Sequence, residues 1–211
     1  IPFVYFRLRE FWNTGVRGRK DVEDMTTLPV LGEIPVRKEG MGDGQIVVSE
    51  NKNDRITEAF RLLRANLDFM NKGAKVLMFT STMAGEGKTF VSRNLAVILA
   101  GTGKKVVLVD TDIRKRTQSK LSGAKCKEGV STFLSGIYTD ISGLIIPAQL
   151  HPNVDGLPAG SIPPNPAELL MSDRLELLIA ELKKHYDYII LDNVPALVVA
   201  DASIVNRVAE I

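Results

Sequence analysis

The sequence contains only one cysteine in 211 residues, which excludes an intrachain disulfide framework. It shows no cleavable signal peptide and no apolar run of the roughly 20 residues that cross a bilayer. These features fit a reducing compartment, the cytosol or a surface that faces it. An excess of one charge is also missing, because 27 basic residues stand against 25 acidic ones. A net charge of +2 does not indicate a nucleic-acid partner.

Hydrophobic residues make up 45% of the chain, enough to bury a core, which excludes disordered and fibrous proteins. A domain of this length buries roughly 70% of the surface that its unfolded chain exposes. A second full domain would be cramped at this length. We therefore expect one domain with an appendage.

The appendage is expected at the N-terminus, where the first twenty residues hold five basic residues against Glu10. The apolar run Ile1–Phe6 precedes all of these charges, and Phe11 and Trp12 lie among them. Two interpretations stay open: an amphipathic helix that packs on the domain, or the cytoplasmic end of a membrane helix flanked by positive charge. We expect residues 1–27 to form a basic, aromatic juxtamembrane segment and residues 28–54, which have little periodicity, to form a docking linker.

From Arg55 the pattern becomes helical, since apolar residues recur every three or four positions at Ile56, Phe60, Leu63, Leu67 and Met70. Further on, β-rich apolar runs alternate with helical patterns. The runs cover residues 76–80, 106–109 and 188–191, and the helical patterns cover 89–99, 166–184 and 202–209. This alternation predicts an α/β domain over residues 55–211, with a mostly parallel sheet flanked by helices.

A glycine-rich loop joins the first apolar run to its helix, with the sequence Ser81-Thr82-Met83-Ala84-Gly85-Glu86-Gly87-Lys88-Thr89. Gly85 and Gly87 allow backbone N–H groups to approach phosphate oxygens, and the helix N-terminus adds its positive dipole end. Lys88 can reach the β and γ phosphates, and the Thr89 hydroxyl can ligate magnesium. Thr82 replaces the first glycine of the general G-x-x-x-x-G-K-[ST] pattern, but the position between strand and helix still predicts a phosphate-binding loop.

Carboxylates follow two other predicted strands. Asp110 and Asp112 come just after the 106–109 run, and Asp192 ends the 188–191 run. In open α/β sheets, ligands bind at the carboxyl ends of the strands. Asp192 is suited to bind Mg²⁺ directly or through water. Together with the loop, these residues predict a site for a nucleoside triphosphate and magnesium.

These motifs resemble those of the bacterial tyrosine kinases, the autokinases attached to polysaccharide-export copolymerases. Residues 85–89 resemble the family's Walker A motif, residues 110–114 its D-x-D-x-R Walker A′ motif, and residues 190–192 its Walker B motif. Two departures are Ala84 and Asn193-Val194-Pro195, because the family usually has a proline at the first position and a second proline in the other segment.

Glu58, Arg61 and Arg64 match the family's E-x-x-R-x-x-R oligomerisation motif. Without the resemblance, Glu58 and Arg61 would be interpreted as an ordinary intrahelical ion pair worth about 0.2–0.5 kcal/mol. With it, they are expected to support a ring-like homo-oligomer.

The resemblance implies a P-loop NTPase-type fold and an ATP-dependent protein-tyrosine autokinase. Such a kinase transfers the γ-phosphoryl group of Mg·ATP to tyrosines in the C-terminal tail of a neighbouring subunit and regulates exopolysaccharide or capsule synthesis and export. Other implied partners are the membrane-embedded copolymerase part of the same protein and a cognate tyrosine phosphatase, at the cytoplasmic face of the inner membrane. The family carries more strands and a tyrosine-rich tail, so we expect a kinase domain truncated at its C-terminus.

The resemblance also implies the site residues and their roles. The catalytic residues are Lys88, Asp110, Asp112 and Asp192, and the magnesium ligands are Thr89, Asp112 and Asp192. The nucleotide contacts are Ala84, Gly85, Glu86, Gly87, Lys88, Thr89, Phe90 and Arg114. One of Asp110 and Asp112 takes the tyrosine proton; Asp110 is the preferred base and Asp112 assists at the metal.

Three other classes of protein compete with the kinase. Partition and septum-placement ATPases have a similar fold, but their signature lysine near the start of the loop is replaced here by Met83. An iron–sulfur carrier needs a C-x-x-C pair, which a chain with one cysteine cannot form. A pseudokinase that binds nucleotide only to assemble the export machinery remains an alternative, although the intact Lys88, Thr89 and Asp192 argue against it.

Overall fold

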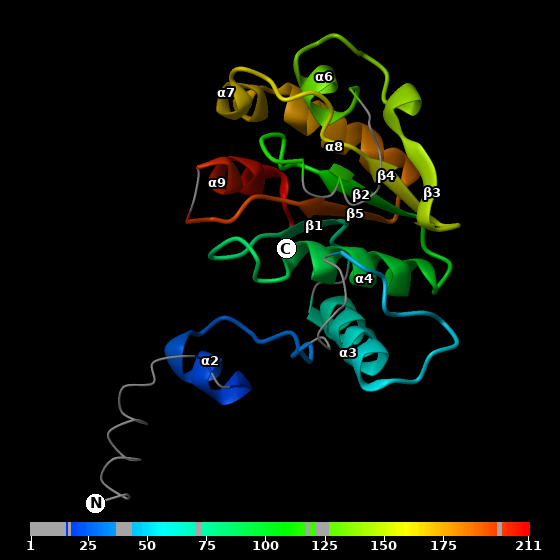
Figure 1. Ribbon diagram of the computed structural model, residues 1–211, viewed down its shortest axis with the longest axis vertical. Coiled ribbons are helices and arrows are strands. Elements are labelled where there is room, and N and C mark those ends of the chain that lie inside the picture. The colour runs from blue at the N-terminus through cyan, green and yellow to red at the C-terminus, as the bar shows by residue number, and fades with distance from the viewer. Residues whose placement is uncertain are drawn as a thin grey trace, which may run out of the picture.

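The computed structural model describes residues 16, 18–36, 44–70, 73–116, 119–120, 127–197 and 200–211. Its centre is a five-stranded sheet of order β1-β5-β2-β4-β3 between two layers of helices (Figure 1). The strands are β1 (Val76–Phe79), β2 (Val106–Asp110), β3 (Ile146–His151), β4 (Val154–Leu157) and β5 (Tyr188–Asp192). All neighbours pair in parallel except β3, which runs antiparallel to β4. The predicted α/β fold with a mostly parallel sheet is confirmed.

One face of the sheet is covered by α4 (Lys88–Ala100), and α3 (Arg55–Met70) packs outside α4 (Figure 1). The other face carries α6 (Val130–Leu134), α7 (Pro166–Met171), α8 (Arg174–His185) and α9 (Asp201–Val205). Short 3-10 turns occupy Ser142–Leu144 and Asn206–Val208, and α2 (Arg19–Met25) lies to one side of α3 (Figure 1). The central strand β2 is buried along its whole length because helices cover both faces.

The helix predicted from Arg55 packs as its periodicity indicates, with Phe60, Leu63 and Leu67 buried. Met70, the last residue of the pattern, is instead 49% exposed at the end of the helix. Beside this helix, the linker residues 45–48 dock on α4 through the buried side chain of Asn94. Its Oδ1 accepts hydrogen bonds from the amides of Val47 and Val48, at 2.9 and 3.4 Å.

Two predicted helices differ from those in the structure. The predicted 166–184 helix is interrupted at Ser172, which is extended and whose hydroxyl donates a 2.6 Å hydrogen bond to the Leu169 carbonyl. This local bond competes with continued helix geometry. The helix predicted at 202–209 begins at Asp201 and tightens into a 3-10 turn after Val205.

Within the predicted juxtamembrane segment 1–27, residues 1–15 and 17, which include the apolar run and three of the five basic residues, lie outside the described residues, whereas Arg19–Met25 form α2. Among the helices of the described ranges, none is both long and apolar enough to cross a bilayer. At the other end of the chain, the Glu210 amide donates to the Val76 carbonyl and the Met78 amide donates to the Ile211 carbonyl, at 2.9 and 2.8 Å. The last residues therefore pair along the outer edge of β1.

Candidate nucleotide-binding site

A cavity opens beside the carboxyl ends of β1, β2 and β5. It is lined by Gly44, Ala84, Gly85, Gly87, Lys88, Thr89, Phe90, Asp112, Lys115 and Pro195. Six of the eight predicted nucleotide contacts are therefore on this cavity; Glu86 and Arg114 are not. The parallel strands bring the loop after β1 and the carboxylates after β2 and β5 to the same edge of the sheet, which is where an α/β sheet binds its ligands.

The loop after β1 adopts a backbone that depends on its glycines. Gly85 has a φ of 89° and Gly87 a φ of 92°, in the left-handed region that other residues rarely adopt. Gly87 caps α4, so the first amides of that helix stand next to the cavity. Glu86 folds back on the loop, where its Oε2 accepts hydrogen bonds from the amides of Thr82 and Met83, at 2.7 and 3.1 Å. Glu86 thus shapes the loop rather than lining the cavity.

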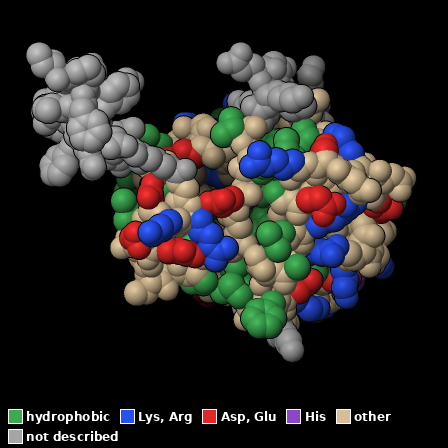
Figure 2. Space-filling view, turned by 90° about the horizontal axis from the view of Figure 1, so that it is seen from below, with side chains coloured by type: hydrophobic (Ala, Val, Ile, Leu, Met, Phe, Trp, Pro, Cys, Tyr) green, Lys and Arg blue, Asp and Glu red, His purple; other side chains and the backbone are tan. Residues whose placement is uncertain are grey.

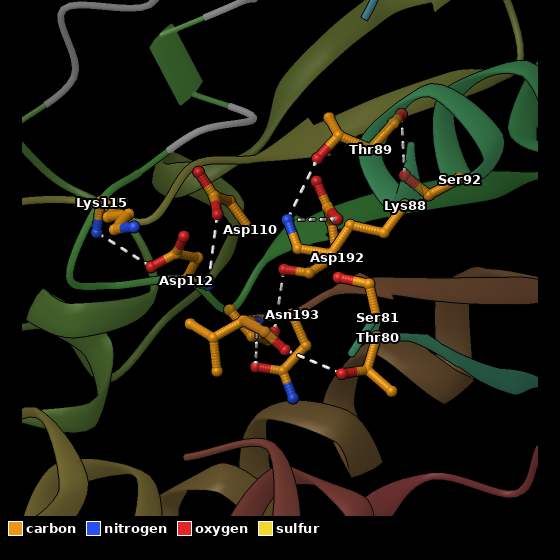
Figure 3. A network of polar contacts seen from close by, with 12 residues as sticks. Thr80, Ser81, Lys88, Thr89, Ser92, Asp110, Asp112, Lys115, Asp192 and Asn193 are labelled. Carbon is orange, nitrogen blue, oxygen red and sulfur yellow. Dashed lines mark hydrogen bonds and ion pairs between the residues drawn. The ribbon is translucent and has the colours of Figure 1, made fainter. Parts of the chain in front are cut away.

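Lys88 and Thr89 line the cavity, and the buried carboxylate of Asp192 lies next to them (Figure 3). The Lys88 ammonium lies 3.9 Å from Asp192 Oδ1 and 3.5 Å from Thr89 Oγ1. Burial raises the pKa of Asp192 to about 6, against the opposing effects of the Lys88 charge and a hydrogen bond from Thr89. The Oδ1 atom of Asp192 is buried and makes no hydrogen bond within the described part of the protein. A buried carboxylate oxygen that lacks a hydrogen-bond donor and lies next to a threonine hydroxyl is a suitable ligand for a hard divalent cation.

The other residues around this carboxylate also fit a magnesium ion bound together with nucleotide. Within the described ranges, no group of three or more His, Cys, Asp and Glu side chains forms a self-sufficient metal site. Mg²⁺ typically uses one or two carboxylates and completes its octahedral shell with phosphate oxygens and water. Thr89 and Asp192 would therefore hold the ion jointly with the nucleotide phosphates.

Asp110 and Asp112 occupy different environments although they are two residues apart. Asp110 is fully buried, and its Oδ2 accepts hydrogen bonds from the amide and the hydroxyl of Ser119, at 2.8 and 2.6 Å. Burial raises the pKa of Asp110 to about 7, against these hydrogen bonds. The Ser119 hydroxyl in turn accepts a 2.9 Å bond from the Ala159 amide. The structure therefore places Asp112 on the cavity and Asp110 in the interior behind it.

The adjacent residues Arg114 and Lys115 also have different partners. Arg114 donates two hydrogen bonds, of 2.6 and 3.0 Å, to the carboxylate of Asp201, which is buried at the start of α9. Lys115 lines the cavity. Sequence reasoning missed Lys115, together with Pro195 and Gly44. Only the position of Lys115, directly after the D-x-D-x-R motif, could have indicated it.

The three residues of the predicted oligomerisation motif lie on α3. Arg61 contacts the Glu58 carboxylate within the same helix and donates a 2.8 Å hydrogen bond to the backbone carbonyl of Glu50. The intrahelical pair considered from the sequence is thus present, with the Glu58 side chain 57% exposed. On the face that carries α2 and α3, apolar side chains lie among acidic and basic ones (Figure 2). Leu62 and Phe69 are exposed apolar residues of α3.

The raised pKa values of Asp110 and Asp192 predict an unusual pH dependence. Between their ordinary pKa near 4 and the folded values of about 7 and about 6, the native state binds protons that the unfolded state releases. The free energy of unfolding of the ligand-free protein should therefore fall as the pH rises from about 4 to about 7. For Asp192 alone, the difference of about two pKa units between the folded and unfolded states corresponds to roughly 3 kcal/mol of unfolding free energy.

Urea unfolding measured at a series of pH values checks this prediction. Asp110→Asn should flatten the slope, because the amide cannot titrate but can still accept the Ser119 hydrogen bonds. Asp173→Asn, at an exposed position before α8, serves as the matched control and should leave the slope unchanged. A stability that rises with pH over the same interval in the wild type would contradict the burial argument.

The fold and the site together define a P-loop nucleotide-binding domain, with a glycine-rich loop between a parallel strand and a helix and with carboxylates at neighbouring strand ends. The sequence profile of a family described as an AAA domain matches residues 74–207. The kinase domain of the Escherichia coli tyrosine kinase ETK is 31% identical, with a TM-score of 0.80 over 92% of this chain and 79% of that one. The chain belongs to the bacterial tyrosine kinase family, which confirms the resemblance drawn from its motifs.

Two other relatives show how much of a longer kinase the chain covers and how similar it is to a septum-placement protein. The tyrosine-protein kinase wzc of Salmonella typhi is 41% identical over 223 residues, which cover 98% of this chain and 31% of that protein. The chain thus spans about a third of the length of that relative. The septum site-determining protein MinD of Pyrococcus horikoshii, complexed with Mg-ADP, is more distant: it is 28% identical, with a TM-score of 0.55 over 64% of this chain and 55% of that one.

Proposed function

We propose that this chain binds Mg·ATP and transfers its γ-phosphoryl group to tyrosine hydroxyls. The observation that carries the proposal is that Lys88, Thr89 and Asp112 line one cavity, with the buried Asp192 carboxylate 3.9 Å from the Lys88 ammonium, in a member of the bacterial tyrosine kinase family. A divalent metal with the nucleotide follows from the family and from the donor set. The nucleotide would be ATP and the metal Mg²⁺.

The residues of the cavity have distinct roles in this transfer. The loop amides and Lys88 hold the β and γ phosphates and offset their negative charge. Magnesium, when held by Thr89 and Asp192, supplies further charge neutralisation at those phosphates. Asp112 also lines the cavity, and its charge acts on Asp192, so it would assist at the metal. The loop amides, Lys88 and the magnesium ion would therefore stabilise the negative charge that develops on the phosphates during transfer.

The acceptor tyrosine must lose a proton during transfer. A phenol with a pKa of about 10 stays protonated at neutral pH, so a nearby carboxylate assists the reaction. As its O–H bond breaks, the tyrosine oxygen forms a bond to the γ-phosphorus, and the bond from that phosphorus to ADP breaks. The sequence favoured Asp110 as base. We instead assign the proton to Asp112, because Asp112 lines the cavity and Asp110 is buried against Ser119.

The biological setting is proposed from the family resemblance. The kinase would act at the cytoplasmic face of the inner membrane, joined to the membrane-embedded copolymerase part of the same protein. Its acceptors would be tyrosines in the C-terminal tail of a neighbouring subunit, and a cognate tyrosine phosphatase would reverse the modification. The output would be control of exopolysaccharide or capsule synthesis and export.

The exposed side of α3 leads to a prediction about assembly. We propose that Arg61 and Arg64 contact acidic groups of a neighbouring copy, Glu58 among them, in a head-to-tail interface that closes into a ring. Sedimentation velocity should detect a salt-sensitive oligomer for the wild type and a monomer for the Arg61→Ala/Arg64→Ala variant. Lys104→Ala, at an exposed turn after α4, is the control and should behave as the wild type. Identical sedimentation of all three proteins across salt and concentration would contradict the interface.

Phosphoamino-acid analysis tests the proposed activity. The protein is incubated with γ-labelled ATP and a tyrosine-containing copolymer, with magnesium or with EDTA. Label in phosphotyrosine that requires magnesium is the expected result. Release of labelled inorganic phosphate without any phosphotyrosine would instead support an ATPase switch, and binding without turnover would support a pseudokinase scaffold.

A further inference from the structure

Two lysines line the nucleotide cavity, and they differ in what their ammonium groups contact. Lys88 is held beside Asp192 and Thr89, and its side chain is only 12% exposed. Lys115 is exposed, and within the described part of the chain its ammonium group makes no ion pair or hydrogen bond. Lys115 therefore presents a charge to the cavity that no carboxylate of the described residues neutralises by direct contact.

Arg114, the arginine of the D-x-D-x-R motif, is committed to another partner. Its guanidinium binds both oxygens of Asp201, and the Asp201 side chain is only 2% exposed. Moving Arg114 toward the nucleotide would leave a buried carboxylate without its counter-charge, which is strongly unfavourable. The motif arginine thus joins the turn after β2 to α9, and it does not line the cavity.

The turn that carries these two residues has a defined geometry. The Lys115 amide donates a 2.9 Å hydrogen bond to Asp112 Oδ1, and the Arg116 amide donates a 2.8 Å bond to the Asp112 backbone carbonyl. In Figure 3, Lys115 and Asp112 lie together on one side of the view, and Lys88, Thr89 and Asp192 lie on the other. The turn therefore anchors Lys115 next to the carboxylate that faces the cavity.

We infer that Lys115 binds the terminal phosphate of the nucleotide in this cavity, whereas Arg114, the predicted nucleotide contact of the same turn, binds Asp201. The inference rests on the proposed nucleotide binding. Lys88 would bind the phosphates next to the loop, and Thr89 and Asp192 would hold the magnesium ion there. On the other side of the cavity, the negative charge of Asp112 would repel a terminal phosphate. Lys115 offsets that repulsion and supplies a second cation where charge accumulates during transfer.

This placement predicts discrimination between a nucleoside triphosphate and a diphosphate, because ADP lacks the phosphate that Lys115 would contact. A charged hydrogen bond of this kind contributes a factor of about 10 or more to affinity. Lys115→Met should therefore weaken the binding of AMP-PNP about tenfold or more, while ADP affinity changes by less than about twofold. Lys115→Arg keeps the charge and should retain AMP-PNP binding within about threefold.

Calorimetric titration of the whole chain with Mg·AMP-PNP and with Mg·ADP tests the inference. Lys104→Met, an exposed lysine on a turn away from the cavity, is the matched control and should bind both ligands as the wild type does. Arg114→Met is compared in parallel and should not weaken AMP-PNP selectively. Thermal unfolding of each variant establishes that it is folded.

Three results would overturn the assignment of Lys115. They are unchanged AMP-PNP affinity in folded Lys115→Met, an equal loss of affinity for both nucleotides, and a selective loss in Arg114→Met but not in Lys115→Met. Failure of the wild type to bind either nucleotide would reject the proposed function as well. If the wild type and Lys115→Met both bind ADP, the proposed nucleotide binding holds even where the assignment of Lys115 fails.

Discussion

Lys88→Met should lower the rate of phosphoryl transfer by at least about a hundredfold while the protein stays folded. The change removes the cation that lies beside Asp192 and Thr89 at the mouth of the loop. Nucleotide affinity should fall as well, since a hydrogen bond to a charged group typically contributes about 1.5–3 kcal/mol. The fold should persist because Lys88 lies at the first turn of α4, outside the two hydrophobic clusters of the core.

Calorimetry with Mg·ATP, together with the transfer assay, checks this prediction. Lys104→Met carries the same substitution at an exposed turn and should match the wild type in both measurements. A folded Lys88→Met variant with unchanged nucleotide affinity would mean that the loop after β1 does not bind phosphate. A variant that fails to fold would instead show that the Lys88–Asp192 pair is needed for the native structure.

Asp192→Asn should move activity and stability in opposite directions. Transfer should fall about a hundredfold or more, because a neutral amide is a poor magnesium ligand. The ligand-free protein should become more stable at pH 7.5, by about 1–3 kcal/mol. The reason is that burial raises the pKa of Asp192 to about 6, so its ionised form is disfavoured in the folded state at that pH. Both effects arise from one buried carboxylate.

Urea unfolding with and without Mg·ADP separates these effects. The wild type should gain stability from Mg·ADP, and Asp192→Asn should gain much less. Asp173→Asn makes the same chemical change at an exposed position and should alter neither quantity. If Asp192→Asn lost stability in the absence of ligand, the buried charge would be a structural element of the fold rather than a site kept for the metal.

The central strands and the loop were predictable because their signals are local. The apolar run of β2 is buried on both faces, and the loop sequence lies between strand and helix. Strands β3 and β4 escaped prediction, since Pro147 and Gly156 weaken their local preference and tertiary pairing decides their structure. The break between α7 and α8 depends on a hydrogen bond of the Ser172 hydroxyl that no periodicity encodes.

The orientation of the site residues could not be predicted for a related reason. Arg114 binds Asp201, a residue 87 positions further along the chain. Asp110 is buried against Ser119, which is itself bonded to the distant Ala159 amide. Motif spacing identified which residues approach the edge of the sheet. Only contacts between remote segments determine which of two neighbouring side chains lines the cavity.

A crystal structure of the protein with Mg·AMP-PNP tests the central claim most directly. We expect the phosphates in the loop formed by residues 84–89 and the metal ion ligated by Thr89 and Asp192, directly or through water. The terminal phosphate should lie between Lys88 and Lys115. A nucleotide bound away from this loop, or a metal ion held without Thr89 and Asp192, would contradict the account.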